Sequence, residues 1–197
     1  MSEKLVAVIF VKQSRRFPGK HSAMIGERSL LDTVAEKVTS SKQFGRVIIL
    51  SKDPRVKSGI CDVVQDNTDG TILNSLRFAL ASYGNVFAFA GDMPCITSSI
   101  FRRELSMFEN KAVVPRRPDG TLETLHAIYP SLTTSYIDAN LMAHRFGLRD
   151  LVEIIPHVLY PVPPDEEANF LNVNTPSDLE LVIENGCGKH PLKTRKW

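Results

Sequence analysis

Residues 87–94 read Phe-Ala-Phe-Ala-Gly-Asp-Met-Pro, a short apolar run that ends in glycine, a carboxylate and proline. The run is too short for a typical helix and predicts a central strand buried on both faces. Pro94 ends the strand because proline has no N–H to donate to a sheet ladder. Asp92 is therefore expected at the carboxyl end of the strand, where open α/β sheets bind their ligands. A carboxylate there can hold a divalent cation, or it can cap the helix expected from Thr97 or close a turn.

Strands and helices alternate on both sides of this run. Upstream, apolar segments predict strands at 5–11, 46–50 and 61–64, and helical patterns fall at 29–40 and 71–81. Downstream, helices are expected at 97–108, 131–143, 147–155 and 176–185, and strands at 112–115, 123–129, 157–162 and 169–173. The alternation predicts a doubly wound, mostly parallel α/β sheet with right-handed crossovers. The turn at 116–120 lies between two of these strands and predicts a small β-hairpin insertion.

The composition is that of an ordinary globular protein. The chain has 197 residues, 43% hydrophobic and 23% charged, which suffices for one domain with a sizeable core. The net charge of +2 gives no argument for nucleic-acid binding, and no apolar run approaches the roughly 20 residues that span a bilayer. Cys61, Cys95 and Cys187 are far apart and odd in number, so we expect neither a zinc site nor a disulfide framework, which fits a reducing cytoplasm. We expect one domain at 1–186 and a flexible basic tail at 187–197.

A basic loop follows the first strand. Residues 12–20, Lys-Gln-Ser-Arg-Arg-Phe-Pro-Gly-Lys, hold four cations in nine positions. Loops in this position commonly cradle phosphates with backbone N–H groups, to which arginine and lysine add charge. Arg16 and Lys20 flank a stiff Phe-Pro-Gly turn that can present both side chains to one ligand. The same charges fit a solvated loop, and the sequence is neither a P-loop nor a dinucleotide-binding fingerprint.

An asparagine-rich segment lies near the end of the chain. Asn172 and Asn174 alternate along the strand expected there, so both amides project from one face and can bind a metal or a ligand. The alternative is that Thr175 caps the following helix and the asparagines satisfy local turns.

Glu123 and His126 lie near or within the strand expected at 123–129. A lone histidine is more often structural than catalytic, so the pair alone does not define a site. No serine–histidine–acid or cysteine–histidine spacing stands out, and a covalent nucleophile mechanism therefore has no support.

Several of these motifs together resemble one enzyme family. They are the first strand with its basic loop, Ala-Gly-Asp-Met-Pro at 90–94, Glu-Thr-Leu-His-Ala-Ile-Tyr at 123–129 and Asn-Val-Asn-Thr-Pro at 172–176. Their order and spacing are similar to those of nucleotidyltransferases of the molybdenum-cofactor guanylyltransferase type, over roughly residues 4–185. The resemblance implies a single Rossmann-like α/β domain. It also implies transfer of a nucleoside monophosphate from an NTP to a phosphorylated acceptor, with Mg²⁺ and release of pyrophosphate.

The resemblance further implies roles for single residues. Asp92 matches the family's magnesium ligand, and Asn174 falls where relatives place a second carboxylate or an asparagine. The implied catalytic residues are Arg16, Lys20 and Asp92, and the implied metal ligands are Asp92 and Asn174. The implied nucleotide-binding residues are Val11, Lys12, Ser14, Arg16, Lys20, Asp66, Gly70 and Asp92. The implied acceptor-binding residues are Glu123, His126, Asn172 and Asn174.

One departure from the family pattern concerns the start of the basic loop. The guanylyltransferases have a Gly-Gly pair where this chain has Val11 and Lys12, and glycines let phosphates approach the backbone closely. The rest of the loop looks more like that of cytidylyltransferases that activate acidic sugars. The expected function is guanylyl transfer from GTP to molybdopterin. The alternatives are cytidylyl transfer to molybdopterin or an acidic sugar, and a non-catalytic nucleotide-binding protein on the same fold.

The expected partners follow from this reading. They are a nucleoside triphosphate and a phosphorylated small-molecule acceptor, with no nucleic acid and no membrane. The protein is expected to be a cytoplasmic monomer or small homo-oligomer.

Overall fold

A seven-stranded sheet runs through residues 4–188, the part of the chain that the computed structural model describes. Its strands are β1 (Val6–Val11), β4 (Arg46–Ser51), β5 (Asp62–Gln65), β6 (Val86–Ala90), β7 (Ala112–Arg116), β8 (His126–Tyr129) and β9 (His157–Pro161). The strand order is β5-β4-β1-β6-β8-β7-β9, and within this sheet β8 runs antiparallel to both of its neighbours. The other pairings are parallel, which confirms the mostly parallel α/β sheet predicted from the sequence.

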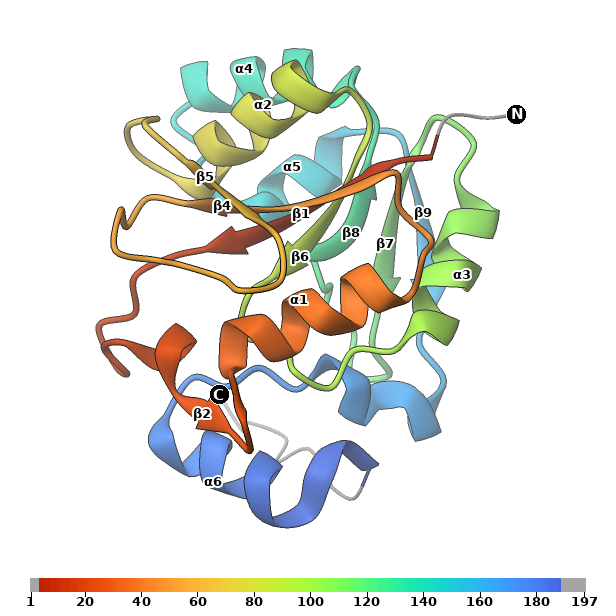
Figure 1. The fold of residues 1–197 in the computed structure, drawn as a ribbon. Coiled ribbons are helices and arrows are strands. Elements are labelled where there is room, and N and C mark those ends of the chain that lie inside the picture. The colour runs from red at the N-terminus through yellow and green to blue at the C-terminus, as the bar shows by residue number, and fades with distance from the viewer. Residues whose placement is uncertain (1–3, 189–197) are drawn as a thin grey trace.

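Helices cover both faces of the sheet (Figure 1). The α-helices are α1 (Leu30–Ser40), α2 (Ile72–Tyr83), α3 (Ser98–Met107), α4 (Thr133–Met142), α5 (Leu148–Ile154) and α6 (Pro176–Asn185). One face is covered by α1 and α3 and the other by α2, α4 and α5, whereas α6 lies below α1 (Figure 1). No helix in the described residues is both long and apolar enough to cross a membrane.

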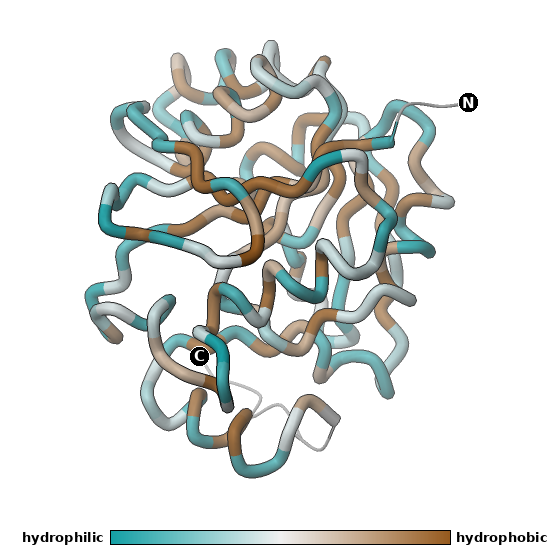
Figure 2. Tube along the Cα trace, viewed as in Figure 1, coloured by the Kyte–Doolittle hydropathy of each residue, from teal (hydrophilic) through white to brown (hydrophobic). Residues whose placement is uncertain are grey.

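Burial on both faces explains the unbroken apolar runs of the central strands. In β1, Ala7 and Ile9 pack in the layer under α1 and α3, whereas Val8 and Phe10 pack in the layer under α2, α4 and α5. Successive side chains of a strand point to opposite faces, so each face needs apolar residues. In Figure 2, hydrophobic segments follow the inner strands and hydrophilic segments lie in the outer loops.

The predicted hairpin is present but is built into the main sheet. β8 lies between β6 and β7, with His126 opposite Phe89 and Ile128 opposite Val113. A second, two-stranded ribbon, β2 (Met24–Ile25) and β3 (Arg28–Ser29), was not predicted because two residues give no periodic pattern. Within residues 4–188, three 3₁₀-helices were also not predicted, namely η1 (Lys20–Ser22), η2 (Pro164–Phe170) and η3 (Gly186–Gly188).

The prediction of a strand at 169–173 is wrong. The segment after η2 is an irregular loop that crosses to the start of α6. The N–H groups of Asn174 and Thr175 donate to Asp178 Oδ2 at 2.9 and 2.8 Å, and Thr175 Oγ1 accepts from the Asp178 N–H. Residues 169 and 170 belong to η2, and the capping box fixes the backbone that leads into α6, so the helix-capping alternative for Thr175 is confirmed.

A disulfide between Cys95 and Cys187 contradicts the expectation that the cysteines form no bridge. The bridge joins the β6–α3 connection to η3, with Cα atoms 5.0 Å apart and a sequence separation of 92 residues. This separation explains why the sequence did not indicate the pairing. The two residues come together only because α6 places η3 next to the β6–α3 connection. The predicted tail begins at this bridge, but residues 189–197 of it lie outside the described part of the chain.

Candidate active site

The ends of β1 and β6 bring the basic loop and Asp92 together. The strands are parallel neighbours, with Phe10 opposite Ala90, and the Gly91 N–H donates to the Phe10 carbonyl at 3.0 Å. A Cβ added to Gly91 would lie 3.0 Å from Val11 Cγ2 and 3.3 Å from the Phe10 carbonyl oxygen. Glycine therefore permits the close approach of the two chain segments, and Asp92 follows it directly.

Lys20 and Asp92 form an ion pair at this junction. Lys20 Nζ contacts Asp92 Oδ2 and also donates to the Val173 carbonyl at 3.2 Å. The Lys20 side chain is 6% exposed, and the Asp92 side chain is 16% exposed. Charges held this far from water interact more strongly than they would at the surface. Two of the three predicted catalytic residues are thus in direct contact.

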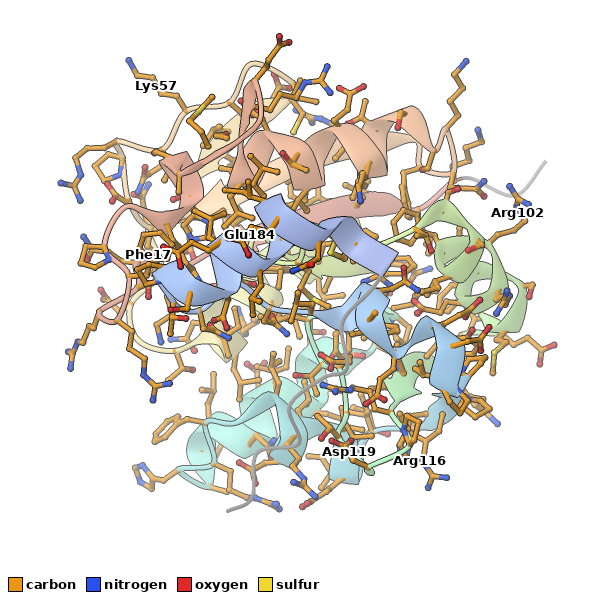
Figure 3. All side chains as sticks on the ribbon, turned by 90° about the horizontal axis from the view of Figure 1, so that it is seen from below. Phe17, Lys57, Arg102, Arg116, Asp119 and Glu184 are labelled. Carbon is orange, nitrogen blue, oxygen red and sulfur yellow. A yellow bond between two sulfur atoms is a disulfide. The ribbon has the colours of Figure 1, made fainter. Side chains whose placement is uncertain are left out.

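Local hydrogen bonds shape the basic loop and turn Lys20 inward. Ser14 Oγ accepts from the Phe17 N–H at 3.2 Å, and the Lys20 N–H donates to the Phe17 carbonyl at 3.2 Å. Gly19 has a φ of 71°, a left-handed conformation that glycine adopts at low cost. Phe17 packs against a small apolar cluster at α6 and lies beside that helix in Figure 3. Arg16 stays exposed and available to a ligand that enters from solvent.

His21 ties the basic loop to the end of β6, a role that was not predicted. Its Nδ1 lies 3.3 Å from the Gly91 carbonyl oxygen and its Nε2 lies 3.1 Å from the Lys12 carbonyl oxygen. Burial lowers the pKa of His21, although the Lys12 carbonyl acts in the opposite direction. Both partners are acceptors, so a neutral imidazole can donate to only one of them at a time. A single histidine in a loop carries no sequence pattern that would indicate this contact.

Val11 and Lys12, at the start of the basic loop, differ in their surroundings. The Val11 side chain is buried in the core layer under α1 and therefore does not face a ligand. Lys12 is exposed, and its carbonyl oxygen contacts His21. Contact of these two residues with a nucleotide stays a prediction, which for Val11 concerns the backbone.

Asp66 organises the loop after β5. It is buried and accepts from the Ser75 hydroxyl and from the Thr68 N–H at 2.9 Å, with Lys52 Nζ 3.3 Å away. Burial alone would raise the pKa of Asp66, but the hydrogen bonds from Ser75 and Thr68, together with Lys52, hold it below its ordinary value. The carboxylate is thus largely engaged within the protein and shapes the loop that carries Gly70.

The start of α2 offers buried oxygen atoms that have no partner within the described residues. Thr71 Oγ1 and Asn74 Oδ1 are buried without a hydrogen bond, beside Gly70 with its φ of 82°. Buried polar atoms are normally hydrogen-bonded, so these two are candidates for contact with a ligand. β5 lies three strands from β6, roughly 14 Å away, which suits the two ends of a nucleoside triphosphate.

His126 does not have the position expected of an acceptor ligand. Its side chain is fully buried, with Nε2 3.4 Å from Oε1 of the equally buried Glu104. Its ring contacts the aromatic side chains of Phe87, Phe89, Phe101 and Phe170. Burial raises the pKa of Glu104, and His126 opposes this only in part. The structural interpretation of the histidine therefore holds, because β8 directs its side chain into the core under α3.

The other predicted acceptor residues lie at or near the carboxyl edge of the sheet. Glu123 is 8% exposed and pairs with Arg117 at 3.4 Å. Burial raises the pKa of Glu123, and Arg117 acts in the opposite direction.

Asn172 and Asn174 flank Val173, whose N–H donates to the Asp92 carbonyl at 2.8 Å. The asparagine segment is therefore held next to Asp92 even though it is not a strand.

Residues 12–158 match the MobA-like NTP transferase domain. The chain belongs to the MobA-like NTP transferase family. It is 30% identical over 183 residues to the probable molybdenum cofactor guanylyltransferase of Thermococcus gammatolerans, an alignment that covers 88% of this chain and 95% of the relative.

Solved structures share the fold of this MobA-like chain. Molybdopterin-guanine dinucleotide biosynthesis protein A from Archaeoglobus fulgidus superposes with a TM-score of 0.74 at 21% identity, covering 91% of this chain and 97% of that one. A cytidylyltransferase from Leptospira borgpetersenii superposes with a TM-score of 0.70 at 16% identity, covering 92% and 85%. At these identities the superpositions show the fold alone.

The donor set of the MobA-like site suits a metal that arrives with the nucleotide. Within residues 4–188 no group of three or more His, Cys, Asp or Glu side chains could hold a metal ion by itself. Asp92 offers carboxylate oxygens, and Asn174 offers an amide oxygen from the neighbouring segment. Mg²⁺ commonly binds through one or two carboxylates, several waters and the phosphates of the substrate. The residues present therefore fit Mg²⁺ in a nucleotide complex.

Proposed function

We propose that this nucleotidyltransferase transfers GMP from GTP to molybdopterin, with Mg²⁺, and releases pyrophosphate. The observation that carries the proposal is the Lys20–Asp92 pair, placed where the basic loop of β1 meets the end of β6. The choice of GTP and molybdopterin is supported by the name of the relative from Thermococcus gammatolerans. A cytoplasmic location is part of the same proposal, and there cellular thiols would act on the Cys95–Cys187 disulfide.

The charged residues would act on the phosphates. Lys20 and Arg16 would neutralise oxygens of the triphosphate, and the loop around Ser14 would hold both side chains in place. The acceptor's phosphate oxygen attacks the α-phosphorus, so a P–O bond to the acceptor forms while the bond to pyrophosphate breaks. Fixed cations in a poorly hydrated site stabilise the charge that develops in this step. Mg²⁺ held by Asp92, with Asn174 as a second ligand, would add charge neutralisation when bound.

Pyrophosphate release tests the proposal directly. The assay combines Mg²⁺ with GTP or CTP and offers molybdopterin or acidic sugars as acceptors. We expect release with GTP and molybdopterin, and a loss of about a hundredfold or more in turnover for Asp92→Asn. Asp165→Asn, a change at an exposed carboxylate in η2, is the matched control and should keep full turnover.

The other outcomes separate the alternatives. Release with CTP alone would replace guanylyl transfer by cytidylyl transfer, and the acceptor that supports release would identify the branch. Full turnover in Asp92→Asn would exclude Asp92 from catalysis. A folded protein that releases no pyrophosphate with any pair would contradict the proposed reaction.

A further inference from the structure

A polar cavity lies at the carboxyl edge of the sheet, beyond β8 from the candidate active site. It has a volume of about 510 Å³ and lies between the turn that joins β7 to β8 and the end of β9. Its lining residues are Arg116, Arg117, Pro118, Asp119, Gly120, Pro161, Val162 and Pro164. Small-molecule sites typically have volumes of about 300–1,000 Å³, so the cavity is large enough for a ring system.

The sheet register puts this cavity level with Asp92. Val113 of β7 and Phe87 of β6 both pair with Ile128 of β8. Because β6 and β7 run in the same direction, Arg116 is level with Ala90, two residues before Asp92. The two strands are separated by β8 alone, so the cavity lies roughly 10 Å to the side of the Lys20–Asp92 pair. One elongated ligand can therefore reach both places along the same edge of the sheet.

Arg117 forms a fixed wall of the cavity. Its Nη2 donates to Glu167 Oε1 at 2.8 Å, its Nε donates to the same oxygen at 3.1 Å, and its Nη1 lies 3.4 Å from Glu123 Oε1. The Arg117 side chain is 15% exposed. Two carboxylates thus hold the guanidinium in place, and they connect the cavity with Glu123, a residue already expected on the acceptor side.

Arg116 and Asp119 provide the groups that a ligand could use. Neither residue forms an ion pair among the described residues, and Arg116 also has no side-chain hydrogen bond there. Asp119 Oδ1 accepts from the Thr121 N–H at 2.9 Å, which fixes the carboxylate at the turn. In Figure 3, Arg116 and Asp119 lie near each other at the lower edge of the molecule, away from Phe17.

The charge balance argues against a phosphate in this cavity. Glu123 and Glu167 pair with Arg117, so the charges of the lining that have no ion-pair partner in the described residues are those of Arg116 and Asp119, one of each sign. A dianionic phosphate would gain no net attraction from these two, whereas a neutral ring with both donors and acceptors would be matched. A guanidinium donates to ring nitrogens and carbonyl oxygens, and a carboxylate accepts from ring N–H and amino groups.

We propose that this cavity binds the pterin end of the acceptor, with Arg116 and Asp119 as its recognition groups, while the acceptor's phosphate lies at Lys20 and Asp92. This proposal rests on the proposed function for the identity of the acceptor. A pterin presents carbonyl and ring-nitrogen acceptors on one part of its edge and N–H donors on another. The cavity is thus a specificity site that acts on acceptor binding and leaves the nucleotide untouched.

Fluorescence titration with unsubstituted pterin, 2-amino-4-oxopteridine, tests the cavity without requiring turnover. We expect Arg116→Ala and Asp119→Asn each to weaken pterin binding about tenfold, whereas the affinity for GTP with Mg²⁺ stays unchanged. Asparagine keeps the acceptor for the Thr121 N–H, so Asp119→Asn should keep the turn. The matched control is Arg102→Ala, an exposed arginine of α3 outside the cavity, which should bind pterin as the unmodified protein does.

The outcomes distinguish this proposal from the proposed function. Loss of pterin binding in the two cavity variants supports the cavity site, even if the unmodified protein releases no pyrophosphate. Equal binding by all variants, or no binding by the unmodified protein up to the solubility limit of pterin, overturns it. If transfer to molybdopterin proceeds in the cavity variants with an unchanged KM for the acceptor, the reaction stands and the cavity assignment falls.

Discussion

Lys20 and Asp92 neutralise each other at a point where a nucleotide complex would use both charges for other partners. In the proposed nucleotide complex, Asp92 would hold the metal and the Lys20 ammonium would move from the carboxylate to a phosphate oxygen. The Val173 carbonyl, 3.2 Å from Nζ, can keep one hydrogen bond during such a move. The pair thus keeps two largely buried charges satisfied.

The first residue-scale prediction concerns the stability of this pair. Lys20→Met should lower the free energy of unfolding by about 3 kcal/mol, because it leaves Asp92 unpaired in a largely buried place. The double variant Lys20→Met/Asp92→Asn should regain most of that loss, since it removes the isolated charge. Urea denaturation of the unmodified protein, Lys20→Met and the double variant measures these differences in the free energy of unfolding. If the double variant is as unstable as the single one, the ion pair is not the cause.

The second residue-scale prediction concerns pH and the buried Glu104–His126 pair. Burial raises the pKa of Glu104 in the folded protein above its unfolded value, so the folded state retains a proton that the unfolded state loses. Stability from this group is present below the unfolded pKa and is lost as pH rises through the folded pKa. Glu104→Gln should remove the contribution of Glu104 to this loss of stability. The plot of unfolding free energy against pH should therefore become flatter.

The pH experiment has a built-in comparison. Glu180→Gln, at an exposed position of α6, should leave the pH dependence as it is. Unfolding free energies from urea titrations between about pH 4 and pH 8 cover the expected range. An unchanged slope in Glu104→Gln would contradict the assignment of the pH effect to this carboxyl.

At this scale the sequence was informative for residues whose role follows from their place in a motif. Asp92 and Lys20 follow strands whose ends meet, and they are in contact. The positions of His126 and Asp66 depended on packing that no local pattern reveals. His21 was missed for the same reason, because its two partners come from different segments of the chain.

At the scale of elements, the C-terminal helix is the part that depends most on tertiary contacts. α6 packs through a small cluster that contains Leu30, Cys95 and Val182, and the Cys95–Cys187 disulfide closes the connection. Cys95 lies three residues after Asp92, so the bridge and the site share one loop. The sequence predicted α6 at 176–185 correctly from Pro176 at its first turn. It could not reveal the bridge, and it misread the preceding loop as a strand because the alternating asparagines imitate a strand pattern.

The element-scale prediction concerns this bridge. Cys187→Ser should destabilise the oxidised protein by about 4 kcal/mol, because the disulfide restrains a loop of about ninety residues in the unfolded chain. In Cys187→Ser, amide hydrogen exchange should become faster in α6 than in the unmodified protein, and this increase should be larger in α6 than in β6. Cys61→Ser is the control, since Cys61 is free and its loss should not change the effect of reduction. Equal stability of the oxidised and reduced proteins would show that the bridge does not stabilise the fold.

At the scale of the whole molecule, alternation of strands and helices was enough to predict the sheet but not its strand order. No local pattern in the sequence indicates that β8 is inserted between β6 and β7, because strand order depends on contacts between segments far apart in the chain. The insertion widens the carboxyl edge of the sheet beyond β6, where the proposed acceptor would lie beside the nucleotide. The same edge extends to β5 on the other side, where the buried oxygens of Thr71 and Asn74 lack partners in the described residues.

A nucleotide that spans β5 to β6 should stabilise the domain as a unit. At a GTP concentration of one hundred times Kd, binding should add about 2.7 kcal/mol to the free energy of unfolding, which thermal melting detects as a rise in Tm. The rise should need Mg²⁺, because Asp92 then has a cation in place of Lys20, and it should be largely lost in Asp92→Asn. Asp165→Asn should respond as the unmodified protein does. An equal rise in the presence of EDTA would mean that GTP binds without the metal and that Asp92 serves only to hold Lys20.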